Sequence, residues 1–303
     1  MTRFPLQNRE DSLATISVAR GAAIRQTLRI ADLRAAMRKI GVPLLTAAGV
    51  LAYSHLLASA GFGQAGDAVI MTVFAAAAIS SIAGFAFSAV CGAGLFHLHI
   101  GQVSVVQIMM VCSIAIQGYM VAALWRSIPW RVVIRFLAGG IIGLPAGLAI
   151  LLHTGRTTFL PLIGMLLCIY SVYMLFRRPI HLPERARLGD VFVGVLGGIT
   201  GGAVAFPGAP VTAWSQMFGW QRDYQRGIYQ PFILIMHLLA LGAMFWTGAA
   251  APASPALLTA GLAVPPALAG TMLGIGWYRQ FSDRQFFIAV NLLLLLSGVT
   301  MFA

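Results

Sequence analysis

Long apolar runs separated by short polar segments make up most of the chain. A run of about 20 apolar residues is enough for one helix to cross a bilayer. Such runs lie at 40–60, 102–125, 132–152, 158–176, 228–248, 256–276 and 285–303. Two further apolar stretches, 68–97 and 189–218, are longer and rich in glycine and other small residues. They are long for a single helix, so each is predicted to contain a break.

The positions of the arginines predict how the two long stretches are threaded. Cytoplasmic loops of membrane proteins carry an excess of Lys and Arg. If every stretch crossed once from a cytoplasmic N-terminus, the arginines from 177 to 187 would lie outside. If each long stretch enters and returns on one side, almost every basic residue lies inside, and Arg156 is the exception. We therefore predict two re-entrant segments, which are tolerated at membrane depth where they are buried in protein or line a wet cavity.

The two long stretches open corresponding halves of the chain. The matching pairs are Cys91-Gly92 with Pro207-Gly208, Gln107 with Gln230, and Ala146-Gly147 with Ala269-Gly270. Each half has one hairpin and three spans, and this odd number of crossings gives the halves opposite orientations. Such inverted repeats are common in secondary transporters. The predicted fold is an all-α integral membrane bundle with repeats at 68–176 and 189–303, plus an additional transmembrane helix at 40–62.

Composition agrees with the membrane assignment. Of the residues, 59% are hydrophobic and 9% are charged, whereas a soluble domain has about 25% charged residues. So few charges cannot form a water-exposed surface, which excludes a soluble domain. The formal net charge of +12 does not indicate a nucleic-acid partner, because the arginines lie between apolar runs. The three cysteines lack metal-ligand spacing, and we predict no metal and no cofactor.

Residues 1–39 precede the first span and are predicted to form a cytoplasmic basic amphipathic helix. Arginines alternate there with apolar residues, so the helix would lie on the cytoplasmic leaflet, held by anionic lipid. A mitochondrial transit peptide is the alternative, although Glu10, Asp11 and Asp32 count against it. We therefore expect a multi-pass protein of the bacterial inner (plasma) membrane with a cytoplasmic N-terminus.

The glycine-rich hairpins are the candidate binding segments. A half-helix N-terminus at the midplane carries unpaired N–H donors and about half a positive charge, so it can hold an anion without a costly buried Lys or Arg. Glycine permits close backbone approach there, and proline ends a helix. The candidate residues for a small anionic solute are Gly84, Ser88, Cys91, Gly92, Thr200, Gly201, Gly202, Pro207 and Gly208. Alternatively, the glycines only allow helices to pack closely.

Three polar residues within the spans are further candidates. Gln107 and Gln230 lie near the starts of equivalent spans, where their amides could bind a substrate oxyanion or bond across helices. His237 is the clearest titratable group near mid-depth. It could couple transport to protons, because histidine changes charge near neutral pH. A neutral, hydrogen-bonded core histidine is the alternative.

The second long stretch reads Gly194-Val-Leu-Gly197-Gly198-Ile-Thr-Gly201-Gly202-Ala-Val-Ala-Phe-Pro207-Gly-Ala-Pro210. In this stretch the chain resembles the TauE/SafE family of membrane transporters, whose members have two glycine-rich segments that end in a proline. The resemblance covers about 68–303 and implies export or uptake of sulfite, sulfonates and related small anions. The chain departs from the family pattern at Ala203-Val204-Ala205-Phe206, where glycines are usual, and the first copy has no proline.

The predicted function is therefore a secondary transporter, or permease, of small anions such as sulfite, a sulfonate or a related organic acid. A membrane enzyme would need convergent acids, histidines or a nucleophile, and only one carboxylate, Asp190, lies near a core segment. The remaining alternative is a non-transporting subunit that assembles with or regulates a partner through its basic N-terminal helix. Substrate identity, direction, coupling ion and a homo-oligomeric state stay open.

Overall fold

The computed structural model describes residues 43–57, 63–83, 86–98, 100–176, 187–218, 220–252 and 254–278, and separate residues between 288 and 302. The predicted N-terminal helix, Gly84, and most of the predicted last span lie outside the described residues. The chain forms a short unit, Met1–Leu51, and a large unit, Ala52–Ala303. The helix Pro43–Leu57 covers the described part of the first unit, and everything below concerns the second.

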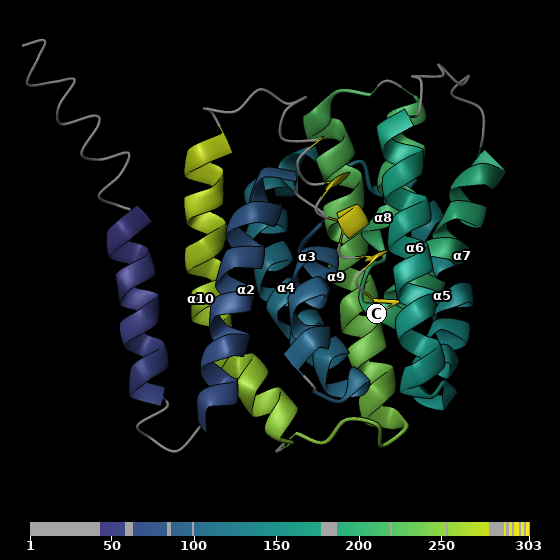
Figure 1. Ribbon diagram of the computed structural model, residues 1–303. Helices are drawn as coiled ribbons and strands as arrows, with labels where there is room; N and C mark the ends of the chain where they lie inside the picture. The colour runs from purple at the N-terminus through teal and green to yellow at the C-terminus, as the bar shows by residue number, and fades with distance from the viewer. Residues whose placement is uncertain are drawn as a thin grey trace, which may run out of the picture. The chain divides into compact units, whose positions relative to one another are not determined.

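The described residues of the large unit form helices and no strand (Figure 1). The helices are α2 (Gly63–Ala83), α3 (Phe87–Leu95), α4 (Gln102–Leu124), α5 (Trp130–His153), α6 (Arg156–Phe176), α7 (Arg187–Val204), α8 (Gly208–Met217), α9 (Arg222–Trp246) and α10 (Pro255–Tyr278). Short 3-10 turns follow α3 (η2, Phe96–Leu98) and α4 (η3, Trp125–Ser127). Among the described residues, five helices are long and apolar enough to cross a membrane. The predicted polytopic helical fold is confirmed.

Both long apolar stretches are broken, as predicted. The first gives α2 and α3, and the second gives α7 and α8. In the second, the indole Nε1 of Trp214, near the end of α8, donates to Oδ1 of Asp190, in the first turn of α7, at 2.9 Å. The start of α7 and the end of α8 therefore lie side by side, and the chain returns to the end where it entered.

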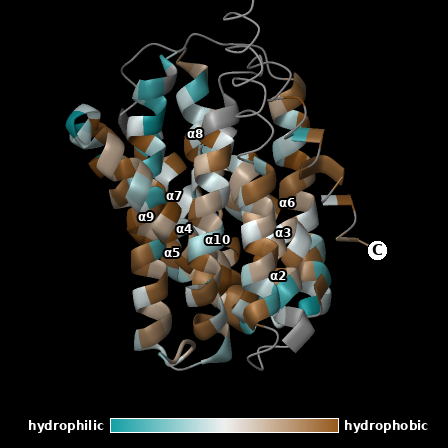
Figure 2. Cartoon of the chain, turned by 90° about the vertical axis from the view of Figure 1, so that its left-hand side faces the viewer, coloured by the Kyte–Doolittle hydropathy of each residue, from teal (hydrophilic) through white to brown (hydrophobic). Residues whose placement is uncertain are grey.

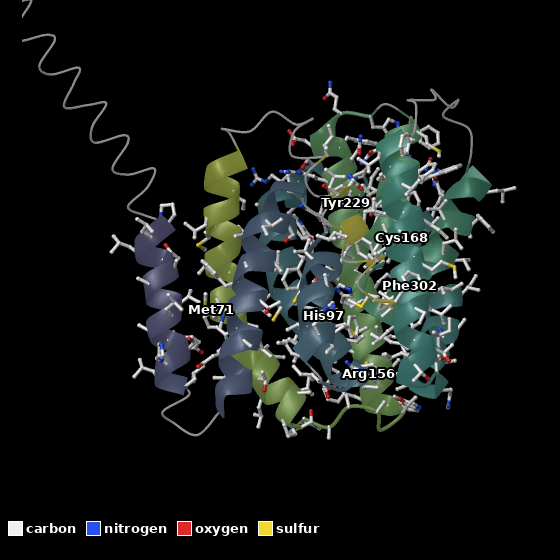
Figure 3. The ribbon with its side chains drawn as sticks, viewed as in Figure 1. Met71, His97, Arg156, Cys168, Tyr229 and Phe302 are labelled. Atoms are coloured by element: carbon white, nitrogen blue, oxygen red, sulfur yellow. The ribbon has the colours of Figure 1, made fainter. Side chains whose placement is uncertain are left out.

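The two hairpins open toward opposite ends of α5. Asp190, at the start of α7, forms an ion pair with Arg135 near the start of α5. The end of the first hairpin lies instead near the other end of α5, where Arg156 donates to the carbonyls of Phe96 and Ile100 at 2.8 and 2.7 Å. Figure 3 labels Arg156 low in the view, near the lower ends of the helices. This arrangement supports the prediction that the two halves have opposite orientations in a membrane.

Each hairpin packs mainly against a helix of the other half. α7 packs along α5, and α2 packs along α10. The corresponding helices α4 and α9 also pack together, and they run antiparallel. Gln107, near the start of α4, reaches Ala249, just past the end of α9, whereas Ser127, just past the end of α4, lies against Gly227 near the start of α9. α7 and α2 are corresponding helices of the two halves, and so are their partners α5 and α10. The two contacts are therefore equivalent, which supports the predicted repeat.

Glycines bring α5 and α7 into backbone contact. Three glycines on each helix face main-chain carbonyls of the other, so that an added Cβ would overlap them: Gly139, Gly143 and Gly147 on α5, and Gly194, Gly198 and Gly202 on α7. In both helices these glycines recur every fourth residue, which places them on one face. Small residues that recur in this way allow close packing in bilayers, where helices gain little from hydrophobic burial against each other.

The opposite face of α5 is apolar and exposed. Ile134, Ile141 and Ile142 are all more than half exposed, although water would disfavour such a face. Figure 2 shows hydrophobic residues along most of the length of the helices. This pattern of small residues inside and branched apolar residues outside is expected when lipid covers the outer face.

Candidate functional site: the break between α7 and α8

The break between α7 and α8 is held by hydrogen bonds across its own turn. Ala205, the first residue after α7, has φ 52°, a left-handed conformation that costs a non-glycine residue about 1 kcal/mol. The next residue, Phe206, donates its N–H to the carbonyl of Thr200 at 3.2 Å. Its own carbonyl accepts the hydroxyl of Thr200 at 3.0 Å. The same hydroxyl also lies 3.0 Å from the carbonyl of Leu196 within α7, so the bond from the Phe206 N–H to the Thr200 carbonyl is what ties this predicted site residue to the turn.

His237 on α9 contacts the same turn. Its Nε2 lies 3.1 Å from the carbonyl oxygen of Ala205, and its side chain is fully buried. A carbonyl oxygen only accepts, so Nε2 must carry the hydrogen. Nδ1 of the neutral ring is then an acceptor, and it has no hydrogen-bond partner among the described residues.

α8 begins inside the protein with no side chain capping it. Pro207 occupies the N-cap position, and Gly208, Ala209, Val211 and Thr212 are all buried. The first N–H groups of a helix have no partner within the helix, and they lie at the positive end of its dipole. The sequence of α8 contains no charged residue. Because Pro207 and Pro210 have no N–H group, the backbone donors of this buried, electropositive terminus are the N–H groups of Gly208 and Ala209.

Gln230 on α9 and Thr212 on α8 carry further unpaired polar atoms on the same two packed helices. Gln230 is fully buried and Thr212 is 1% exposed. Both amide atoms of Gln230 and the hydroxyl of Thr212 lack a partner among the described residues. α8 runs back along α9 from the contact of Ala205 with His237. Thr212 lies about one turn into α8, and Gln230 lies about two turns before His237 on α9, so both lie on the same side of the contact between Ala205 and His237.

A buried polar atom left unpaired costs about 1–3 kcal/mol. Four such atoms belong to three residues on the packed helices α8 and α9: Nδ1 of His237, both amide atoms of Gln230, and Oγ1 of Thr212. They provide both donors and acceptors to anything that binds there.

Residues 69–301 match the family model of the sulfite exporter TauE/SafE. The chain belongs to the TauE/SafE family. No curated protein and no solved structure matches it. Members of this family are transporters rather than enzymes. The chain is therefore a multi-pass membrane transporter, as the resemblance of the second long stretch implied.

The first half of this TauE/SafE protein has a different environment at the equivalent position. Gln107 corresponds to Gln230, but its Nε2 donates to the carbonyl of Ala249 at 3.0 Å. Ser88 and Cys91, also predicted for the site, are buried within α3, and no side chain caps the start of that helix. Gly92 faces the side chains of Met109 and Phe96.

The glycines predicted for the second hairpin divide into two groups. Gly202 faces the backbone of α5 at Leu144 and Leu148, and so belongs to the packing of α7 on α5. Gly201 faces the ring of Pro207 instead, while Gly208 opens α8. Close packing, the alternative given for the glycines, is thus sufficient to explain Gly202. Thr212 is not among the predicted site residues, although the position of this threonine one turn after Gly208 could have indicated a role.

A second polar cluster joins the open end of the hairpin to α5. Oδ2 of Asp190 lies 2.9 Å from Nε of Arg135, an ion pair whose geometry is not that of a hydrogen bond. Its other oxygen accepts the indole N–H of Trp214. The side chain of Arg135 is 33% exposed and that of Asp190 only 6%. This cluster connects α5, α7 and α8 away from the break, which indicates a positioning role.

Proposed function

We propose that this TauE/SafE protein moves a small anion across the bacterial inner membrane and binds it at the buried N-terminus of α8. The substrate class is sulfite, a sulfonate, or a related sulfur oxyanion or organic acid. The observation that carries the proposal is Gln230, which is fully buried with both amide atoms unpaired. Such an amide is costly in the empty protein, and a bound ligand would satisfy it.

The chemistry of the site suits an anion. Backbone N–H groups at a helix N-terminus bind anions readily. The amide of Gln230 and the hydroxyl of Thr212 add donors to this terminus. Between Arg226 and the end of α9 the sequence has no charged residue, so no cation on α8 or this part of α9 would hold the anion too tightly to release it. Partial charges spread over several donors bind more weakly than a buried arginine, as transport requires.

Removing the hydroxyl of Thr212 tests this assignment. The full chain is reconstituted in proteoliposomes, and flux of labelled sulfite is measured for wild type and for Thr212→Val. Loss of one hydrogen bond to the substrate, worth about 1.4 kcal/mol, should reduce transport at low substrate concentration about tenfold.

Thr259→Val is the matched control. The hydroxyl of Thr259 bonds only to the carbonyl of Pro255 within its own helix at an exposed position, so this variant should keep wild-type flux. Wild-type protein that moves no sulfite, sulfonate or organic acid faster than empty liposomes would refute the proposed function. Equal flux in both threonine variants would move the binding site away from α8.

A further inference from the structure

The unpaired atoms at the break include acceptors as well as donors. Nδ1 of His237 is an acceptor, because Nε2 carries its hydrogen to the carbonyl of Ala205. Oε1 of Gln230 is a second acceptor without a partner among the described residues. Both side chains are fully buried. A ligand that pairs with either acceptor must therefore bring a hydrogen of its own.

A fully deprotonated oxyanion has no such hydrogen. Its oxygens could accept from Thr212, from Nε2 of Gln230 and from the first turn of α8, but they would leave Nδ1 of His237 unpaired. A buried acceptor that stays unpaired in the complex costs about 1–3 kcal/mol of binding free energy. Sites built to bond a substrate hydroxyl discriminate strongly against analogues that lack it.

The site is also longer than a single oxyanion group. Seven residues of helix separate Gln230 from His237, a rise of about 10 Å. The turn at Ala205 contacts His237, and Thr212 lies about one turn into α8, on the Gln230 side of that contact. The α8 terminus lies between these levels, because Gly208 follows the turn directly. One end of a ligand can thus face the donors while the other faces the imidazole.

Resting on the function proposed above, we propose that the transported substrate is a small monoanion that also carries a hydroxyl group. Its charged oxygens accept hydrogen bonds from the α8 terminus, Thr212 and Gln230. Its hydroxyl donates to Nδ1 of His237. His237 then determines specificity by accepting a hydrogen bond, while its Nε2 keeps the bond to the carbonyl of Ala205.

Two sulfonates of matched shape and charge test this inference. Isethionate ends in a hydroxyl group, and propanesulfonate has a methyl group in its place. Their affinities for the purified full chain are measured by calorimetry, and each is also tested as a competitor of labelled sulfite flux. We expect wild type to bind isethionate about tenfold more tightly, the value of one additional hydrogen bond.

His237→Phe removes both ring nitrogens and keeps an aromatic ring at the position. The variant loses the bond to the carbonyl of Ala205 together with the acceptor, so the ratio of the two sulfonate affinities is compared rather than either affinity alone. The preference for isethionate should fall to about onefold. His97→Phe is the control, since Nδ1 of His97 contacts only the carbonyl of Ala93 at an exposed position; it should keep the wild-type preference.

The outcomes separate the inference from the proposed function. If wild type binds both sulfonates and shows no preference, the hydroxyl requirement is wrong, whereas sulfonate flux would still support anion transport. If wild type neither binds nor moves any of these anions, the proposed function fails and the inference fails with it. The wild-type comparison needs no variant, so misfolding of His237→Phe would leave this test intact.

Discussion

The two halves of the protein carry a glutamine at the same position near the start of equivalent helices, and their environments differ. Gln107 donates to the carbonyl of Ala249, from the segment that follows α9. Gln230 is equally buried, and both of its amide atoms are unpaired. The same residue thus holds a loop in one half and is left available in the other. A protein built from two repeats can therefore have a binding site in only one of them.

The helix pairs that join the halves differ in a similar way. α5 and α7 both present glycines to each other. In the equivalent pair, the glycine contacts among the described residues come from α10, through Gly270 and Gly274 against the carbonyls of Phe74 and Ala78. Where glycines of both helices contact the backbone of the other, no side chain at the contact can change its rotamer to relieve a clash. The second hairpin, which lies in the same half as Gln230, therefore packs more closely on its partner helix than the first hairpin does.

The largest expected effect comes from filling that closely packed interface. Gly198→Leu places a side chain against the carbonyl of Gly140, where backbone of both helices would have to move. We expect the variant to yield no monodisperse protein by size-exclusion chromatography in detergent. Gly242→Leu, where an added Cβ meets nothing within 4 Å, should behave as wild type. A folded Gly198→Leu protein would show that α5 and α7 can separate.

The two glutamines should respond to the same substitution with opposite signs. Gln107→Leu leaves the carbonyl of Ala249 without its donor and should lower the free energy of unfolding by about 1–3 kcal/mol. Gln230→Leu removes unpaired buried atoms, so it should leave stability unchanged or raise it by about 1 kcal/mol while flux falls. Thermal unfolding in detergent and proteoliposome flux measure these effects. Equal destabilisation by both substitutions would remove the contrast between the halves.

The smallest expected effect concerns the ion pair at the open end of the second hairpin. Asp190→Asn keeps an acceptor for Trp214 and loses the charge facing Arg135. Because Arg135 is partly exposed, solvent screening should limit the loss to less than about 1 kcal/mol, and high salt should reduce it further. Thermal unfolding at low and high salt measures it. A salt-independent loss of several kcal/mol would show that the hairpin depends on this charge.

Much of the fold could be predicted because its determinants are local. The length of the two long stretches and the arginines around them predicted the breaks that separate α2 from α3 and α7 from α8. Glycine at every fourth residue of α5 and α7 predicts close packing, but a small residue does not specify its partner helix. The pairing of α5 with α7 therefore required the structure.

The candidate site could be predicted only in part. Thr200, Gly208 and His237 lie at the break, and Gln230 lies about two turns before His237 on α9; their role in binding stays a prediction. The sequence could not distinguish Gln230 from Gln107, because the partner of Gln107 lies 142 residues away. Thr212 was missed for a related reason: a threonine in an apolar helix usually bonds to its own backbone, and only the structure shows that this one does not.

The pairing of each hairpin with the other half has a consequence for biosynthesis. α2 leaves the ribosome early, but its main partner is α10, which is made almost 200 residues later. α5 and α7 are separated by only one helix, so they can associate as soon as α7 is inserted. Chains generally fold from the N-terminus during synthesis, yet here the first hairpin waits longest for its partner. Assembly should therefore begin in the middle of the chain and finish where α2 meets α10.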